Sequence, residues 1–374
     1  MVFQPGKKSP ADVDCRRHWT SSTLINSIGS RIACSELGDI PKLSTLDEAK
    51  LVDYLNEHRI TAERDIEVIP LSGGVSSDIS LVRAGDQEFV VKQALEKLKV
   101  KDDWHCDTAR NITERNAIDY VARFMPVAVP RVIHGDSENR LLLLEYLGSG
   151  YAPWKSQLLA GQVDDSTGTK VAQILARLHN ATWGNTEAQK KFDTTESFYA
   201  LRIEPYLVTT GRRHPEVEDL FMAEAERLQT ARSALVHGDY SAKNIMVSAD
   251  RLVVLDWEVA WYGDPAFDLA FLLNLLYLKS LHLRQQSASF LQLIDTIRST
   301  YSSELKHFDQ DLEQRICCLT LMLMLARIDG KSPAEYLTKT ADQELVREFT
   351  KEMLIQNVNR FAEVDTVWRS RLSQ

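Results

Sequence analysis

The feature that most constrains the fold is a single change of hydrophobic period near residue 148. Before it, apolar runs bounded by turn residues predict five strands, at "DIEVIPLSGG", "SSDISLVRAG", "EFVVKQAL", "RVIHGD" and "RLLLLEYL". One polar helical stretch, residues 107–124, follows the third run. After residue 150 the spacing is that of amphipathic helices, as in "TKVAQILARLHNATW". This order predicts a small part made of strands and one helix, followed by a larger helical part.

The composition is typical of a soluble globular chain. The 374 residues are enough for two domains or one large bilobal domain. A formal charge of −9 argues against a nucleic-acid partner, which would favour a basic patch. The five cysteines have no CxxC spacing, so we expect a reducing, cytoplasmic environment without disulfides or zinc. We expect no signal peptide and no membrane partner, because the most apolar stretch, residues 319–326, is too short to span a bilayer.

A polar loop lies between two apolar runs in "LVHGDYSAKNIMV", residues 235–247. Asp239 precedes Asn244 by five residues, and Asp256 ends the next apolar strand, "LVVLD". If the strands that flank Asn244 and Asp256 pair, these two side chains approach each other. Their oxygens are hard ligands that suit Mg²⁺, and Asp239 could accept a proton from a substrate hydroxyl. The alternative is an Asp and an Asn that only satisfy loop amides.

Three linked motifs carry a family resemblance. The pattern HGDxxxxN matches residues 237–244, D-x-E matches 256–258 and GDPxxDLA matches 263–270. Over residues 46–290 the chain resembles the aminoglycoside phosphotransferase/choline kinase family, a small-molecule branch of the protein-kinase-like fold. The resemblance implies an α+β bilobal fold, with a five-stranded antiparallel sheet and one main helix in a small N-lobe and a larger, mostly helical C-lobe. We expect an N-terminal extension at 1–44, a nucleotide-binding N-lobe at 45–147 and a C-lobe at 148–374 with the catalytic loop and acceptor site.

The resemblance also implies roles for residues of the motifs. Asp239 would be the catalytic base, and Asn244 and Asp256 would hold Mg²⁺. His237 and Asp268 would brace the catalytic loop by hydrogen bonds. Glu258 would lie near the metal or the substrate. Lys243 would either contact the γ-phosphate or be solvated.

The nucleotide side is predicted from the first strands. The stretch "LSGGVSSD" lies where the family places its phosphate-covering turn, although it is no Walker A sequence and a plain hairpin turn is the alternative. Its predicted nucleotide-binding residues are Ser72, Gly73, Gly74, Ser76 and Ser77.

A lysine within an apolar strand, Lys92, needs a partner, because an unpaired buried ammonium is costly. The resemblance implies that Lys92 contacts the nucleotide phosphates and pairs with Glu114 of the following helix. The alternative is an edge-strand lysine whose ammonium reaches solvent. By position in the hinge, we expect Glu145, Tyr146 and Leu147 to lie at the adenine.

The acceptor is the part of the site that the sequence defines least. Acceptors of the family include aminoglycosides, choline, ethanolamine, methylthioribose and homoserine. The candidate substrate contacts are Trp257, Trp261 and Arg327, besides Lys243 and Glu258, and further candidates are Tyr199, Arg202 and Tyr262. Two of these have alternatives: Trp257 could equally be core, and the "ARIDGKSP" turn with Arg327 could be a helix end capped by Gly330 in the left-handed conformation.

The sequence therefore predicts an ATP- and Mg²⁺-dependent kinase that phosphorylates a hydroxyl of a small molecule, such as a sugar, an amino alcohol or an aminoglycoside-like acceptor. We expect a monomer or a homodimer. A catalytically inactive pseudokinase is the alternative from another class. A protein kinase is disfavoured by the compact "HGDYSAKN" loop and the lack of an APE-like element after Asp256.

Overall fold

The computed structural model describes residues 48–63, 65–71, 76–95, 110–307 and 309–373. Every described residue belongs to a single compact unit, residues 42–374. Of the predicted nucleotide-binding residues, Ser72, Gly73 and Gly74 lie outside the described residues, as does the predicted extension. The boundaries predicted at residues 44 and 147 stay predictions.

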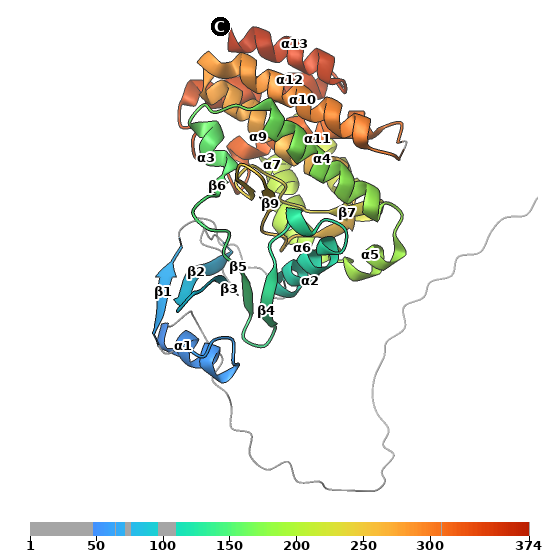
Figure 1. The fold of residues 1–374 in the computed structure, drawn as a ribbon. Helices are drawn as coiled ribbons and strands as arrows, with labels where there is room; N and C mark the ends of the chain where they lie inside the picture. The colour runs from blue at the N-terminus through green and yellow to red at the C-terminus, as the bar shows by residue number, and fades with distance from the viewer. Residues whose placement is uncertain (1–47, 64, 72–75, 96–109, 308, 374) are drawn as a thin grey trace, which may run out of the picture. The chain divides into compact units, whose positions relative to one another are not determined.

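The N-lobe is built on a five-stranded antiparallel sheet with the order β1-β2-β3-β5-β4 (Figure 1). The strands are β1 Ile66–Pro70, β2 Ser77–Ala84, β3 Gln87–Ala94, β4 Val132–Asp136 and β5 Leu141–Glu145. Helix α2, Arg110–Ala122, lies between β3 and β4 in the chain, and α1, Glu48–Glu57, packs on the sheet through its buried face. The predicted five-stranded antiparallel sheet is confirmed, and α2 is the predicted helix after its third strand.

Strand β3 is central in this sheet. Lys92 on β3 lies opposite Ile79 of β2 on one side and opposite Leu142 of β5 on the other. Its residue exposure is 7%. The alternative of an edge-strand lysine that reaches solvent is therefore wrong, because β3 is paired along both edges and the side chain is buried.

The C-lobe is mostly helical. Its helices are α3 Trp154–Leu159, α4 Asp165–Thr182, α5 Thr186–Lys191, α6 Thr195–Phe198, α7 Thr209–Arg213, α8 Glu218–Thr230, α9 Ala266–His282, α10 Ser287–Glu304, α11 Leu312–Asp329, α12 Thr340–Ile355 and α13 Phe361–Leu372. A π-helix, η2, spans Tyr199–Val208, and short 3₁₀ turns span Pro126–Ala128 and Arg284–Gln286. Helix α9 is buried over almost its whole length, and it packs against α10 and α11.

Among the described residues, no single helix combines the length and the apolarity needed to cross a membrane. Helix α9 and the helical segment Arg284–Glu304 satisfy length and composition only as a pair, and that pair is bent by 114°.

Two small sheets hold the predicted catalytic loop. Strands β6 Ala152–Pro153, β8 Ile245–Val247 and β9 Leu252–Val254 form one, and β7 Ala234–Val236 pairs with β10 Trp261–Gly263 in the other. The loop at 237–244 runs from the end of β7 to the start of β8. Because Ile245 lies opposite Val254, Asn244 immediately before β8 and Asp256 shortly after β9 are at the same end of the hairpin. The predicted pairing of these two strands is confirmed.

Candidate active site

Lys92 is the centre of a buried ion cluster that joins the two lobes. Its Nζ lies 2.6 and 2.8 Å from the two carboxylate oxygens of Glu114 and 2.9 Å from Oδ1 of Asp256. Helix α2 positions Glu114 because Ala117, Ile118 and the residues around them bury the same helix face. The structure thus brings together three side chains that are predicted from sequence and come from β3, α2 and the segment after β9.

Three carboxylates surround this lysine. Oxygens of Glu114, Asp256 and Glu258 lie within 4.8 Å of one another. Glu258 accepts a hydrogen bond from Nε of the buried Arg110 at 3.1 Å. Three carboxyl groups this close together offer hard oxygen donors that suit a divalent cation.

The pKa values in the cluster reflect this charge balance. Burial raises the pKa of Glu114 to about 7. The ammonium of Lys92 opposes this rise, whereas the carboxylates of Asp256 and Glu258 add to it. Burial and then the Asp256 carboxylate raise the pKa of Glu258. Burial also opposes ionisation of Asp256, but the ammonium groups of Lys92 and Lys243 lower its pKa overall. Asp256 is therefore the most readily ionised ligand candidate of the three.

Asp239, the predicted base, is buried between two cations. Its Oδ2 lies 2.9 Å from Nζ of Lys243 and 3.1 Å from Nη2 of Arg202. Burial raises the pKa of this carboxyl, but the charges of Lys243 and Arg202 outweigh it and the net shift is downward. Asp239 is therefore a carboxylate at neutral pH, able to accept a hydrogen bond from a hydroxyl.

Hydrogen bonds fix the backbone of this loop. Asp268, at the start of α9, accepts the backbone N–H groups of His237 at 2.7 Å and Gly238 at 2.8 Å. The Nδ1 of His237 accepts the backbone N–H of Asp239 at 3.1 Å, so its proton is on Nε2, which lies 3.0 Å from the carbonyl oxygen of Leu255. Burial lowers the pKa of His237. The neutral imidazole and Asp268 therefore occupy the bracing positions that the resemblance implies.

Two further loop residues have defined geometry. The side-chain amide of Asn244 donates to the backbone carbonyl of Asp239 at 3.0 Å, so its oxygen is the atom that suits a metal. Gly238 has φ +78°, and a Cβ there would lie 2.6 Å from the carbonyl oxygen of Val259. Glycine is required at this position on both counts.

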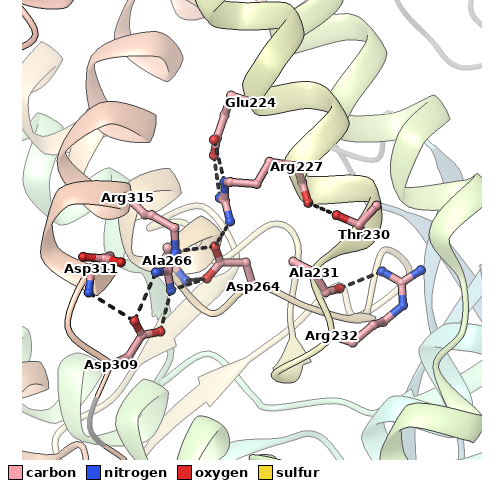
Figure 2. A network of polar contacts seen from close by, with 10 residues as sticks. All are labelled: Glu224, Arg227, Thr230, Ala231, Arg232, Asp264, Ala266, Asp309, Asp311 and Arg315. Carbon is pink, nitrogen blue, oxygen red and sulfur yellow. Dashed lines mark hydrogen bonds and ion pairs between the residues drawn. The ribbon is translucent and has the colours of Figure 1, made fainter. Parts of the chain in front are cut away.

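The aspartate of the "GDP" motif has a structural position. Figure 2 shows Asp264 between Arg227 and Arg315, at 2.7 and 2.8 Å. The same arginines contact Glu224 and Asp309, each at 2.6 Å. This network joins α8 and α11 to the segment that precedes α9, so Asp264 fixes the frame of the site from behind.

The predicted substrate contacts Trp257 and Trp261 are wrong. Trp257 is 1% exposed, its Nε1 donates to the Val254 carbonyl at 2.9 Å, and its ring lies 4.4 Å from that of His237. Trp261 is fully buried and stacks on Phe198 at 4.1 Å. Both tryptophans are core residues beneath the loop 237–244, so neither exposes a ring face that an acceptor could contact.

The remaining predicted residues lie as follows. Glu145 pairs with Arg251 at 2.9 Å, and Tyr146 and Leu147 are half-buried just after β5. The carbonyl of Ser76 accepts a hydrogen bond from Arg110 Nη2 at 2.5 Å, and Ser77 is the first residue of β2. Their nucleotide contacts stay predictions.

Arg327 lies at the end of α11 and bonds to Tyr206 and Ser332. Gly330 has φ −83°, so the alternative of a left-handed glycine cap at this helix end is wrong.

Sequence reasoning missed the partners of the predicted residues. Arg110 is one helical turn before Glu114 on α2, and this i, i+4 spacing could have indicated their shared face. Arg202, which the sequence offers as a candidate acceptor contact, pairs with Asp239 from η2, and no sequence signal indicates a ten-residue π-helix. Such segments are uncommon and occur frequently at functional sites.

The fold and the Lys92–Asp256 cluster define a protein-kinase-like molecule. The chain matches the model of the phosphotransferase enzyme family, APH, over residues 67–292, and it belongs to this family. It is 28% identical to a methylthioribose kinase from Geobacillus kaustophilus over 51% of this chain and 54% of that protein. It is 26% identical to methylthioribose kinase 1 from Oryza sativa subsp. japonica over 62% of each.

Among solved structures, an amicoumacin kinase, hAmiN, in complex with AMP-PNP, Ca²⁺ and Ami aligns with a TM-score of 0.53 at 11% identity, covering 83% of this chain and 96% of that one. This likeness supports the fold class. The chain spans 54% and 62% of the lengths of these two methylthioribose kinases.

Proposed function

We propose that this chain is an ATP- and Mg²⁺-dependent kinase that transfers the γ-phosphate to a hydroxyl of a small molecule. One observation carries the proposal. The Nζ of Lys92 on β3 lies 2.6 Å from a carboxylate oxygen of Glu114 on α2 and 2.9 Å from Oδ1 of Asp256. Asp256 follows the β8–β9 hairpin, which begins at the end of the Asp239 loop. The kinase names of the relatives support the same reaction class.

The residues present fit a divalent cation. Asp256 and the Asn244 side-chain oxygen are the ligands we propose, and Glu258 and Glu114 supply further negative charge within 4.8 Å of Asp256. When bound, the cation would offset the charge on the nucleotide phosphates.

The chain's own side chains then position the reactants. Lys92, which Glu114 holds in place, neutralises phosphate charge. Asp239 accepts a hydrogen bond from the acceptor hydroxyl, aligns its oxygen with the γ-phosphorus and receives the proton as the P–O bond forms and ADP leaves. Arg202 and Lys243 keep Asp239 ionised, so it is a weak base and a precise positioning group, in keeping with catalysis by orientation and charge stabilisation.

The test separates nucleotide binding from transfer. We expect Asp239→Asn to lower kcat by about 10²–10⁴-fold while the thermal shift caused by Mg²⁺ and ATP is retained. Lys92→Met is the matched contrast, and it should abolish that thermal shift. Turnover of Asp239→Asn at the wild-type rate contradicts the role of Asp239. A chain that binds Mg²⁺ and ATP but transfers phosphate to no small alcohol would be a pseudokinase.

A further inference from the structure

A row of cationic and aromatic side chains leads from Asp239 into the C-lobe. The guanidinium carbon of Arg202, the partner of Asp239, lies 5.9 Å from the ring centre of Tyr206. The guanidinium carbon of Arg327 lies 5.9 Å from the same ring, and its Nη1 donates to the Tyr206 hydroxyl at 3.2 Å. One tyrosine ring therefore separates Arg327 from the residue that holds the proposed base.

Arg327 has no carboxylate partner among the described residues. Its Nη1 bonds to two neutral hydroxyls, those of Tyr206 and Ser332, the latter at 2.9 Å. Its Nε is buried and meets no hydrogen-bond acceptor in the described part of the chain. A guanidinium presents five donors in a plane that matches a carboxylate or a phosphate. Burying the Nε donor without an acceptor costs free energy, so its retention favours a ligand for this guanidinium.

A second buried cation, Lys279 on α9, likewise meets no carboxylate in the portion that the structure describes. It is 1% exposed, and its Nζ lies 3.3 Å from the carbonyl oxygen of Leu275 and 4.9 Å from the ring centre of Tyr336. Burial lowers the pKa of Lys279 to about 7, the positive charges of Lys155 and Arg327 act in the same direction, and the carboxylate of Glu335, which is paired with Lys155, opposes them. Arg327 and Lys279 are thus close enough to repel each other.

Other C-lobe arginines are paired with carboxylates or bond to backbone carbonyl oxygens, as Arg232 does with Gln229 and Ala231. In the network of Figure 2, Arg227 and Arg315 share Asp264 and each has a second acidic partner. Arg347 bonds to both oxygens of Asp329 at 2.7 Å. Arg327 differs from these arginines because, among the described residues, its hydrogen bonds go to neutral hydroxyl groups alone.

We propose that the acceptor itself supplies the counterion: it is a small hydroxy compound with a carboxylate or phosphate group that binds Arg327 while its hydroxyl meets Asp239. Lys279 is too deeply buried to contact the acceptor. Its charge acts at a distance on the anionic group that binds Arg327. This inference rests on the proposed function and narrows it, because it disfavours choline-like cations and polycationic aminoglycosides as acceptors.

Matched pairs of probes test the sign of the acceptor's charge. The pairs are glycerate with glycerol, gluconate with sorbitol, and ribose 5-phosphate with ribose, and choline is the cationic control. The full chain with Mg²⁺ and AMP-PNP is examined by thermal shift, and with ATP by ADP release. We expect at least one anionic member to raise the melting temperature and to show a kcat/KM at least tenfold above that of its neutral twin. The carboxylate pairs and the phosphate pair distinguish the two anionic groups.

Variants of Arg327 then identify the contact. Arg327→Gln keeps an amide donor for Tyr206 and Ser332 but removes the charge. It should raise KM for the anionic probe at least tenfold and leave KM for ATP unchanged, while Arg327→Lys should be intermediate. A purely structural role would change both KM values or neither.

The outcomes separate the two levels of the proposal. If Mg²⁺ and AMP-PNP stabilise the protein but no anionic probe does, or if a neutral or cationic probe performs as well as its anionic counterpart, the anionic acceptor is refuted and the kinase proposal stands. An unchanged KM in Arg327→Gln refutes the contact. If Mg²⁺ and AMP-PNP have no effect on the wild-type chain, the proposed function fails and the inference falls with it.

Discussion

Replacing Lys279 by methionine tests whether this chain tolerates a destabilising buried charge. The ordinary pKa of a lysine is 10.5, and burial together with Lys155 and Arg327 lowers that of Lys279 to about 7. Between these two pH values the unfolded chain binds the proton that the folded chain has released. The stability of the wild type should therefore rise with pH through this window, and the full penalty is present below pH 7.

The magnitude follows from the shift. At about 1.4 kcal/mol per pKa unit, the penalty is on the order of 4–5 kcal/mol at pH 6 and about 1 kcal/mol at pH 9.5. Methionine keeps the length of the chain but loses the contact with the Tyr336 ring and the bond to the Leu275 carbonyl, at about 1 kcal/mol each. We therefore expect Lys279→Met to be more stable than the wild type by about 2–3 kcal/mol at pH 6, and to lose this advantage by pH 9.5.

The assay is urea unfolding of both proteins, without ligands, at pH 6, 7.5 and 9.5. Lys351→Met is the matched control, because the side chain of Lys351 is 26% exposed and its ammonium is paired with Glu216 at 2.8 Å. Its unfolding free energy should change by no more than about 1 kcal/mol, as expected for a surface pair. A Lys279→Met variant that is less stable than the wild type at pH 6, or an advantage that does not shrink with pH, would refute the reasoning.

Two further predictions concern the frame of the site. Gly238→Ala should lower the unfolding free energy by about 1–3 kcal/mol and reduce kcat. The reason is that the left-handed backbone and a carbonyl oxygen 2.6 Å from the new Cβ force the catalytic loop to move. Circular dichroism melts measure the stability and ADP release measures kcat, and unchanged values contradict this account. Asp264→Asn should cost about 3–5 kcal/mol by leaving two arginines short of a counterion, with kcat of the folded fraction near that of the wild type. Loss of activity in that variant without loss of stability would indicate a direct catalytic role for Asp264.

Much of the N-lobe and of the catalytic loop is predictable from the sequence, because local rules govern both. Alternating apolar residues define each strand, and the lone Lys92 inside β3 requires a carboxylate within reach. The loop 237–244 is equally local, since its two ends are tied to adjacent short strands. The positions of Asp239, Asn244 and Asp256 at one end of a hairpin therefore follow from the spacing of apolar and polar residues.

The acceptor side depends on the tertiary structure, because side chains there are defined by neighbours far along the chain. Trp257 and Trp261 are residue types that often line binding sites, yet both are buried by packing under the loop 237–244. Arg202 meets Asp239 from η2, which winds as a π-helix, and Arg327 and Lys279 come from α11 and α9, which pack against each other. Sequence periodicity determines which face of an element is apolar, whereas the charge balance of a buried site is settled by which faces meet.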